Sequence, residues 1–419
     1  MKNKIHFAWF ILIGLCITVG LGKAALNNTA GLFVTPISEE LGILKGNLTV
    51  YLSISSIITM IFLPVGGKLM AKYDARAVLI VATILQAGAF AMFGFMSSVW
   101  GWYIFAIPLA VGGVFITVIA GPVMIERWFV KKNGMALGIM TAIGGLMGAF
   151  IQPITGNLIS SFGWRSSYFI IGIAVIVILV PTILFLVRNS PSEKGLLPYG
   201  ETSGTDKEKS KKVLEGILFS DAKKSAAILY LGLFFFMVTA ISSFSVHIPT
   251  YLGEQGYGVK FAGNAMAATM FGVFIGSLIF GYLSDKIGVK KTSIFAMILG
   301  LVSIVLLLAF PGYVAVILIA LMLFGFVTAS IGTIAPAMTS ALFGSRDYSQ
   351  IYSTASMGLA LASIIALPLY GYISDFTGSY VPALYVIIIM LVLNILFIMG
   401  AFHNKKKMVQ SGLWGEETQ

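Results

Sequence analysis

Long apolar runs alternate with short polar turns along almost the whole chain, and most runs are long enough to cross a bilayer as a helix, which takes about 20 residues. Their apolar positions are continuous rather than alternating, which favours helices over the strands of a membrane barrel. The runs predict an all-α membrane protein with twelve transmembrane helices. The predicted spans cover residues 7–34, 47–68, 77–98, 101–125, 134–159, 166–188, 226–252, 261–282, 291–310, 313–342, 349–373 and 380–402.

Composition supports the membrane assignment. Of the 419 residues, 58% are hydrophobic and only 10% are charged, too few charges to coat a soluble protein of this size. The start of the chain is basic and then apolar, as in a signal peptide, but the run continues to Val34 and is interpreted as the first span. The single cysteine, Cys16, excludes an internal disulfide.

One polar stretch, Asn189 to Ser225, is much longer than the other turns and carries seven Lys and six Asp or Glu. It is predicted to be a cytoplasmic linker, with an interfacial helix near Val213 to Phe219. The chain then divides into an N-terminal six-helix bundle (1–188), the linker (189–225), a C-terminal six-helix bundle (226–403) and a cytoplasmic tail (404–419).

The placement of the basic residues predicts the sidedness of the chain. Of the 27 Lys and Arg, 23 fall in the even-numbered gaps between spans and in the two tails, and three fall in the odd-numbered gaps. The positive-inside rule then places both termini in the cytoplasm. The same asymmetry accounts for most of the net charge of +11, so that no nucleic-acid partner is needed. The expected location is the plasma membrane, in a bacterial cell.

The two halves of the sequence repeat each other. Three ordered matches recur at an offset of 214 or 215 residues, and they fall near the turns after corresponding spans. The matched segments are 67–76 with 281–290, 122–129 with 336–343, and 153–163 with 368–378. A six-plus-six duplication is the arrangement of transporters in which two pseudo-symmetric bundles rock about a central site.

The repeated turn resembles the major facilitator superfamily, whose signature is Gly-x3-Asp-Arg-x-Gly-Arg-Arg. The second copy, 281–291, keeps it well, with Asp285 as the acid, whereas the first copy has Ala71 in that place. In the family this acid latches the outward-facing state. The resemblance implies the major facilitator fold and a conformational gate formed by Asp285, Lys286, Lys72 and Arg76. The alternative for Asp285 is a side chain that is only solvated.

Within that superfamily, the chain is similar to the monocarboxylate and oxalate/formate antiporter branch. The similarity rests on 126–138, which contains Arg127-Trp128-Phe129, on 191–200 after the sixth span, and on a lysine inside the first span. The basic and acidic residues that these carriers have in spans 8 and 11 are not found in the cores of those spans here.

That lysine, Lys23, is the main functional candidate. None of the 16 acidic residues falls in the middle of a predicted span, and Lys23 is the only deep basic residue. A buried ammonium either loses its proton or acquires a counter-ion. An anionic substrate is therefore predicted to supply the missing charge, and one positive charge suits a monoanion better than a dianion. The alternative is a lysine that faces a wet cleft.

Other embedded polar residues are weaker candidates. Asn27 lies one turn beyond Lys23 on the same helix face, and it is predicted either to share the anion or to bond a neighbouring helix. His247 is the other embedded group that titrates near neutral pH, and it is predicted either to relay a proton or donate to the substrate, or to bridge helices as a neutral group. The set is completed by Gln86, Gln152, Asn264, Tyr352 and Ser356.

The sequence therefore predicts a secondary active transporter of small organic anions, above all monocarboxylates such as lactate, pyruvate or formate. Alternating access would be coupled to proton symport, with Lys23 or His247 as the proton carrier, or to anion exchange. The alternative is a multidrug-type exporter, against which stands the lack of an embedded acid. No catalytic set, metal cluster or phosphate loop supports an enzyme. No cofactor is expected, and the expected partners are the substrate anion, protons and lipid, with the chain as a monomer.

Overall fold

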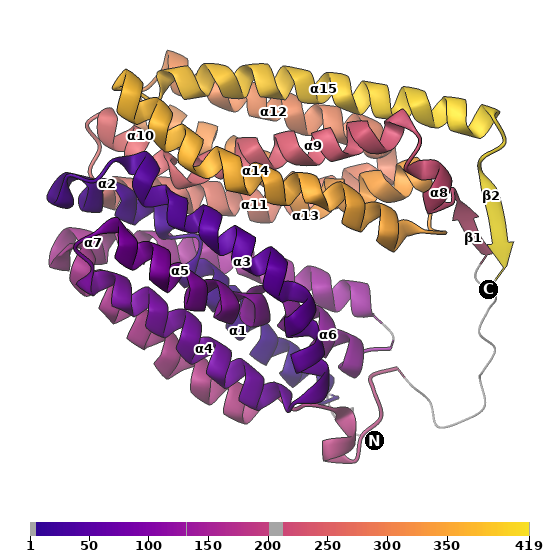
Figure 1. Cartoon of the computed structure of the whole chain (residues 1–419), viewed down its shortest axis with the longest axis horizontal. Helices are drawn as coiled ribbons and strands as arrows, with labels where there is room; N and C mark the ends of the chain where they lie inside the picture. The colour runs from indigo at the N-terminus through magenta and orange to yellow at the C-terminus, as the bar shows by residue number, and fades with distance from the viewer. Residues whose placement is uncertain (1–5, 131, 201–212, 419) are drawn as a thin grey trace. The chain divides into compact units, whose positions relative to one another are not determined.

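The computed structural model describes residues 6–130, 132–200 and 213–418. The described chain is almost entirely helical (Figure 1). It forms two compact units, and the division does not follow sequence order strictly. The first unit holds Met1–Gly204 together with Val246–Ala267, and the second holds Thr205–Ser245 together with Ala268–Gln419. A short segment of the second sequence half therefore packs with the first half.

The first unit is built from continuous apolar helices joined by short turns. Its elements are α1 (Ala8–Leu26), α2 (Ala30–Leu41), α3 (Lys45–Lys72), α4 (Ala75–Met92), η1 (Phe93–Phe95), α5 (Val99–Gly113), η2 (Val114–Ile119), α6 (Ala120–Trp128), α7 (Asn133–Leu186) and η3 (Pro191–Lys194), with α10 (Ile248–Glu254) and the start of α11 (Val259–Ile287) added from the second half. Helix α1 lies in the middle of this unit, where it packs along α7 and also contacts α4 and α6.

The second unit repeats this design. It contains β1 (Val213–Gly216), α8 (Phe219–Ala222), α9 (Ala226–Ser243), η4 (Phe244–Val246, which ends at the unit boundary), most of α11, α12 (Val289–Ala309), α13 (Val314–Phe343), α14 (Tyr348–Thr377), α15 (Val381–Gln410) and β2 (Gly415–Thr418). Helix α9 takes the central place, with α13, α14 and α15 packed around it. Small residues permit these close helix contacts, as is usual in membrane bundles.

Eleven helices of the described chain are long and apolar enough to cross a membrane. One of them, α7, contains two predicted spans, because Gly163 departs from helical geometry (φ 74°, ψ 166°) and bends the chain between them. Glycine tolerates this positive φ, which other residues rarely adopt. Counting α7 as two spans restores the twelve that the apolar pattern predicts, and the helical membrane fold is confirmed.

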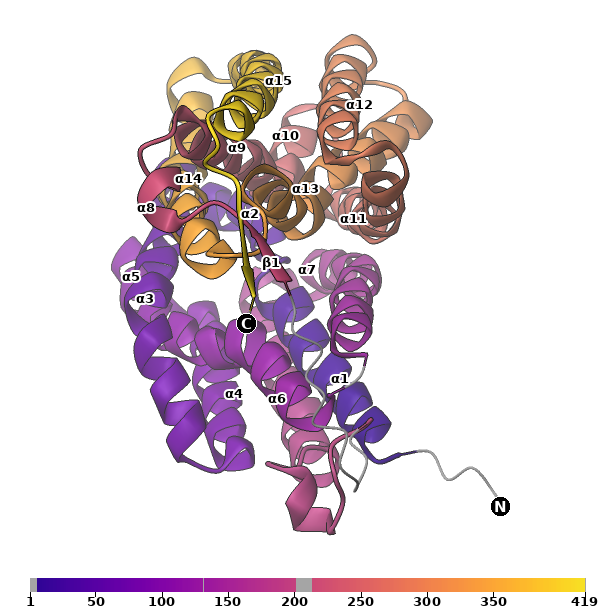
Figure 2. The same cartoon turned by 90° about the vertical axis from the view of Figure 1, so that its right-hand side faces the viewer.

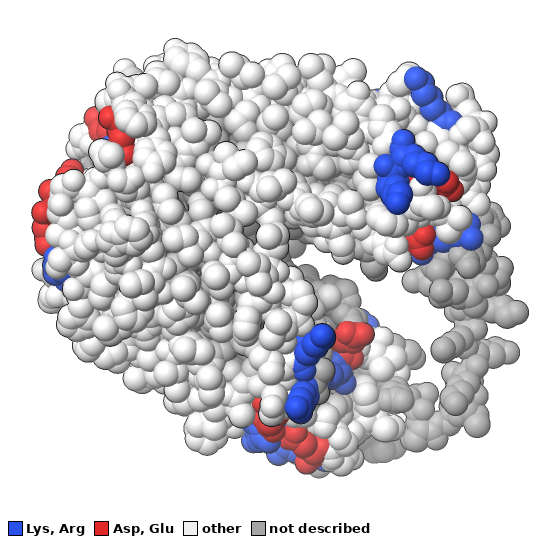
Figure 3. Space-filling model, viewed as in Figure 1, with Lys and Arg blue, Asp and Glu red and all other residues white. Residues whose placement is uncertain are grey.

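Charged side chains gather at the helix ends. On the face seen in Figure 3, blue and red residues lie near the ends of the helices, and the long stretches between them are white. Water and lipid headgroups solvate charge at the ends of a span, whereas the hydrocarbon core does not. The pattern therefore fits helices that cross a bilayer.

Three predicted spans are less regular than the sequence suggested. The first, expected at 7–34, is broken at 27–29 and continues to Leu41. The fourth contains the π-helical turn η2. The seventh, expected as one span over 226–252, is split by η4 into α9 and α10. Apolar periodicity identifies a span but does not report a local break, because broken helices keep the same composition.

The linker prediction was wrong in one place. Where an interfacial helix was expected near Val213 to Phe219, the chain forms strand β1, and only the one-turn helix α8 follows. Strand β1 pairs antiparallel with β2 from the C-terminal end, in a register that joins Val213 to Thr418 and Gly216 to Gly415 (Figures 1 and 2). A strand needs a partner to satisfy its backbone groups, and here the partner comes from the far end of the sequence.

Candidate functional site

The first span of each half is broken at a corresponding position. Helices α1 and α9 begin 218 residues apart, and so do α2 and α10, which follow the two breaks. In the first half the break occupies Asn27, Asn28 and Thr29, and in the second it occupies η4 and His247. Interrupted helices at matching positions of two repeats are the best sequence-level indication of a transport site, because they expose backbone groups within the membrane.

Lys23 lies one turn before the first break and near the middle of its span. It stands 15 residues from Ala8 and 18 from Leu41, the two ends of that span, or about 22 Å and about 27 Å at 1.5 Å per residue. A lysine side chain cannot cover either distance, so snorkelling to an interface does not account for it. The structure therefore places Lys23 at a depth where charge is expensive.

The Lys23 side chain is exposed, although its neighbours from Leu21 to Leu26 on the same helix are all buried. Asn27, one turn further on, is exposed as well. Toward the start of the helix, Leu12, Cys16 and Val19, which share the Lys23 face, are buried. Among the described residues, Lys23 makes no hydrogen bond or ion pair with a side chain. Helix α1 thus has one exposed polar position, at Lys23 and Asn27, on a face whose earlier residues are buried.

Two glutamines fasten the break that follows Lys23. The side-chain amide of Gln152, on α7, donates to the carbonyl oxygen of Asn28 at 2.7 Å. The amide of Gln86, on α4, donates to Oδ1 of Asn27 at 3.0 Å. Both glutamines are buried. They supply the donors that the interrupted helix lacks, which fixes the direction in which the helix leaves Lys23.

The side-chain oxygen of each glutamine can still accept a hydrogen bond. Oε1 of Gln86 and Oε1 of Gln152 are buried and have no hydrogen-bond partner among the described residues. A buried acceptor without a partner costs about 1–3 kcal/mol, so these oxygens favour any donor group that reaches them. Gln152 and Asn27, both predicted as substrate ligands, are thus brought to the same break as Lys23, and Gln86 emerges as a third polar partner.

His247 lies at the second break, between η4 and α10, and its side chain is fully buried. Its backbone carbonyl oxygen accepts from the amide of Tyr251 at 2.8 Å. It belongs to the first unit, with Lys23. His247 was predicted inside an uninterrupted helix, whereas it caps a new one. Its proposed part in proton transfer stays a prediction.

Tyr352 and Ser356 lie one turn apart on α14 in the second unit, and both are half-buried. The Tyr352 ring stacks on Tyr348, with 5.7 Å between ring centroids and an interplanar angle of 9°, and meets the edge of Phe235. Aromatic packing holds this tyrosine in place. Its predicted contact with a substrate stays a prediction.

The first-half members of the predicted gate are held within their own unit. Arg76 pairs with Asp74 at 3.2 Å and with Glu193 at 3.4 Å. Asp74 also caps the start of α4 by accepting from the backbone amide of Arg76 at 2.7 Å. The hydrogen bond from the Arg76 side chain holds the pKa of the Asp74 carboxyl below its usual value. The Lys72 ammonium lies 5.4 Å from the ring centroid of Tyr73.

The second-half members of the gate are exposed. Asp285 and Lys286 lie near the end of α11. The Lys286 ammonium lies 5.4 Å from the ring centroid of Tyr282. Asp285 makes no ion pair among the described residues. A role as a latch between the two copies of the signature stays a prediction.

Sequence reasoning missed the contact between the two halves inside the first unit, named here the half-to-half contact. Helices α7 and α11 meet at Gly156 and Gly263, whose Cα atoms lie so close that a Cβ built on Gly263 would be 2.8 Å from the carbonyl oxygen of Gln152. Lys45 and Glu254 form an ion pair at 3.2 Å across the same contact. In the sequence, the only indication of this contact is the presence of the two glycines, and glycine is common in membrane helices.

Sequence reasoning also did not predict the contacts made by the two motifs that resemble the family, 126–138 and 191–200. The Arg127 guanidinium donates to Oδ1 of Asn189 and to the carbonyl oxygen of Met70. The Trp128 indole donates to the carbonyl oxygen of Arg188 at 3.0 Å. Residues 126–138 and 191–200, quoted separately from the sequence, are therefore partners, and Tyr199 exchanges backbone hydrogen bonds with 128–130. Their function is to fasten the chain after α7 to the end of α6.

A helical membrane protein with a duplicated, interrupted first span belongs to the class of secondary transporters. The chain matches the Major Facilitator Superfamily over residues 15–273 and 254–413, and it belongs to that family.

The relatives within the family are diverse. Multidrug resistance protein MdtG of Proteus mirabilis is 25% identical over 308 residues, which cover 71% of this chain and 70% of that protein. Monocarboxylate transporter 12 of Mus musculus is 21% identical over 403 residues, which cover 90% of this chain and 82% of that protein. The chain is therefore a multi-pass transporter, and these relatives leave its substrate undecided.

The fold has a solved counterpart. A bacterial homologue of the human lysosomal transporter Spinster, in an inward-facing and unoccupied conformation, superposes with a TM-score of 0.73 at 14% identity. The likeness covers 97% of this chain and 99% of that chain. At this level of identity it shows the shared fold.

Proposed function

We propose that this transporter carries small organic monoanions, above all monocarboxylates of the lactate, pyruvate or formate type, and that Lys23 binds the carboxylate. Transport would be by alternating access, with proton symport or anion exchange. The observation that carries the proposal is an exposed ammonium at mid-span, on a helix whose neighbouring residues are buried. Such a charge is stabilised when an anion supplies the counter-charge.

The surrounding residues suit a small carboxylate with a polar substituent. Asn27 lies one turn from Lys23 and its Oδ1 is already held by Gln86, so its amide nitrogen is free to donate toward a bound anion. The side-chain oxygens of Gln86 and Gln152, which are buried and have no partner among the described residues, would accept from a donor group that reaches them. We further propose that both termini lie in the cytoplasm of a bacterial cell and that the chain acts as a monomer.

The similarity to monocarboxylate transporter 12 supports this proposal, and the similarity to the multidrug resistance protein supports an alternative, an exporter of larger molecules. Exporters of cationic drugs commonly use an embedded acid, and no acidic residue lies in the middle of a span of this sequence. Of the two functions, anion transport better explains the positive charge of Lys23 in the middle of a span.

The test is uptake of labelled lactate, pyruvate and formate into proteoliposomes that contain the purified full chain. We expect saturable uptake by the wild type, near-complete loss in Lys23→Ala and partial retention in Lys23→Arg, which keeps the charge and changes its shape. The control is Ile13→Ala, an exposed apolar position of the same helix α1, which should transport normally. Transport that does not depend on Lys23, or that favours cations, would refute the proposal and support the exporter.

A further inference from the structure

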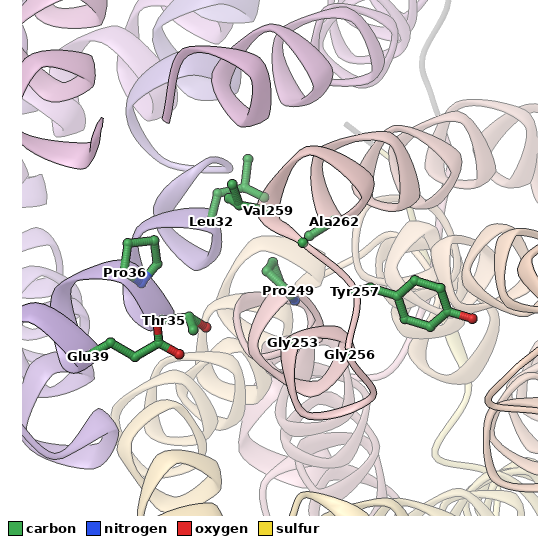
Figure 4. A pocket seen from close by; sticks show the side chains of 11 residues that line it. Leu32, Thr35, Pro36, Glu39, Pro249, Gly253, Gly256, Tyr257, Val259 and Ala262 are labelled. Carbon is green, nitrogen blue, oxygen red and sulfur yellow. The ribbon is translucent and has the colours of Figure 1, made fainter. Parts of the chain in front are cut away.

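A cavity of about 360 Å³ lies in the first unit, between the two sequence halves. One wall is α2, which contributes Leu32, Thr35 and Glu39. The other wall is formed by α10, the turn after it and the start of α11, with Pro249 and Val259 among its residues (Figure 4). Much of the rest of the lining is proline and glycine. These residues have few side-chain rotamers to lose when a ligand binds, which favours a preformed site.

Glu39 is the only charged residue in this lining. It is exposed, and it makes no ion pair among the described residues. The neighbouring acids contrast with it, since Glu40 binds Arg165 at 3.1 Å and Glu254 binds Lys45 at 3.2 Å. In Figure 4 the Glu39 carboxylate points toward the Thr35 side of the cavity. A carboxylate with no cationic partner in the described chain is left available to a ligand.

The other lining residues indicate which kind of cation could pair with Glu39 in this cavity. Oγ1 of Thr35, in the same wall, is buried and has no hydrogen-bond partner among the described residues. Leu32, Pro249 and Val259 add apolar surface, and the Tyr257 ring is held by stacking on Phe261 at 4.5 Å between centroids. An ammonium group donates three hydrogen bonds and carries one charge. A carboxylate on one side and apolar surface on the other favour an organic ammonium ion with a small apolar body.

We propose that this cavity is a second binding site, separate from Lys23, for a small organic monocation whose ammonium group pairs with Glu39. Its walls come from both sequence halves, and in a rocking transporter such walls separate when this side opens. A ligand that needs both walls therefore binds one conformation and stabilises it. The consequence is inhibition of transport without competition for the substrate, whichever substrate Lys23 serves.

Binding is tested on the purified full chain in detergent, with benzylammonium as the probe and benzyl alcohol as its uncharged analogue. We expect benzylammonium to raise Tm by an amount that grows with its concentration and benzyl alcohol to leave Tm unchanged. In Glu39→Gln the concentration that gives the same Tm shift should rise by up to about fivefold, the effect of losing one exposed ion pair worth about 1 kcal/mol. The matched control is Glu40→Gln, which changes the adjacent acid outside the cavity and should keep the wild-type response.

Three results would overturn the proposal: no shift with benzylammonium, an equal shift with benzyl alcohol, or an equal response in wild type and Glu39→Gln. A second measurement uses transport. Benzylammonium should lower the maximal uptake rate and leave the substrate concentration at half-maximal rate unchanged, whereas competition with substrate would place the probe elsewhere. Lys23→Ala should still show the Tm shift, so that failure of the anion-transport proposal and failure of this one are distinguished.

Discussion

The glycine pair at the half-to-half contact makes the sharpest prediction. In Gly263→Ala the new Cβ would stand 2.8 Å from the carbonyl oxygen of Gln152 and 3.2 Å from the Cα atom of Gly156. Both are backbone atoms and cannot rotate away, so α7 and α11 must move apart. The substitution therefore penalises the conformation in which the two helices touch.

The penalty can be sized from the cost of overpacking, about 1–3 kcal/mol for an extra methyl group in a tight contact. Alanine also favours a helix over glycine by about 1 kcal/mol, but this gain is present in every conformation that keeps α11 helical. The difference between conformations is then about 1–3 kcal/mol, which changes their ratio about 5- to 150-fold in favour of the state with the contact open.

The assay follows a buried reporter on α10. Thr250 is 1% exposed, and Thr250→Cys in a Cys16→Ala background gives a single thiol on α10, the second-half helix that contacts α2 of the first half. A membrane-impermeant maleimide should alkylate this thiol faster in Gly263→Ala, by a factor within the range above. The control is Gly144→Ala on α7, where a Cβ meets no atom within 4 Å. An alkylation rate equal to that of the control would refute the reasoning, because the contact would then not be part of a moving seal.

Three further predictions follow from the described contacts. Glu254→Gln breaks the ion pair with Lys45 and should speed alkylation of the same reporter about 5-fold, because such a pair is worth about 1 kcal/mol. Exchanging the two charges, with Lys at position 254 and Glu at position 45, should restore the slow rate. If the slow rate does not return, the ion pair does not hold the contact closed. Gln152→Glu replaces the amide that donates to the carbonyl oxygen of Asn28 with a second acceptor, which should lower the free energy of unfolding by at least about 1–3 kcal/mol in a urea titration, whereas an unchanged midpoint would show that the break does not need the glutamine. Arg127→Met should lower Tm, since it removes the hydrogen bonds that fasten the chain after α7, and the same Tm as wild type would remove Arg127 from that role.

Several features of the site were predictable from single residues. The depth of Lys23 followed from its place in an apolar run, because the energetic cost of a charge in hydrocarbon does not depend on which helix lies beside it. Gln152 was noticed as an embedded polar group for the same reason. Its partner, the carbonyl oxygen of Asn28, was not predictable, because the apolar pattern does not indicate that the first span breaks there.

What the sequence determined by itself is the class of the molecule. Apolar runs long enough to cross a bilayer specify helices and their number, since every backbone group in hydrocarbon must be satisfied within its own segment. The repeated turn added the family.

The tertiary structure decided the rest: the breaks after Lys23 and before His247, the pairing of Arg127 with Asn189, and the close approach of Gly156 to Gly263. Each of these depends on atoms far apart in the sequence meeting at a few ångströms. Composition and periodicity record what a helix buries, but only packing selects the neighbour against which it is buried.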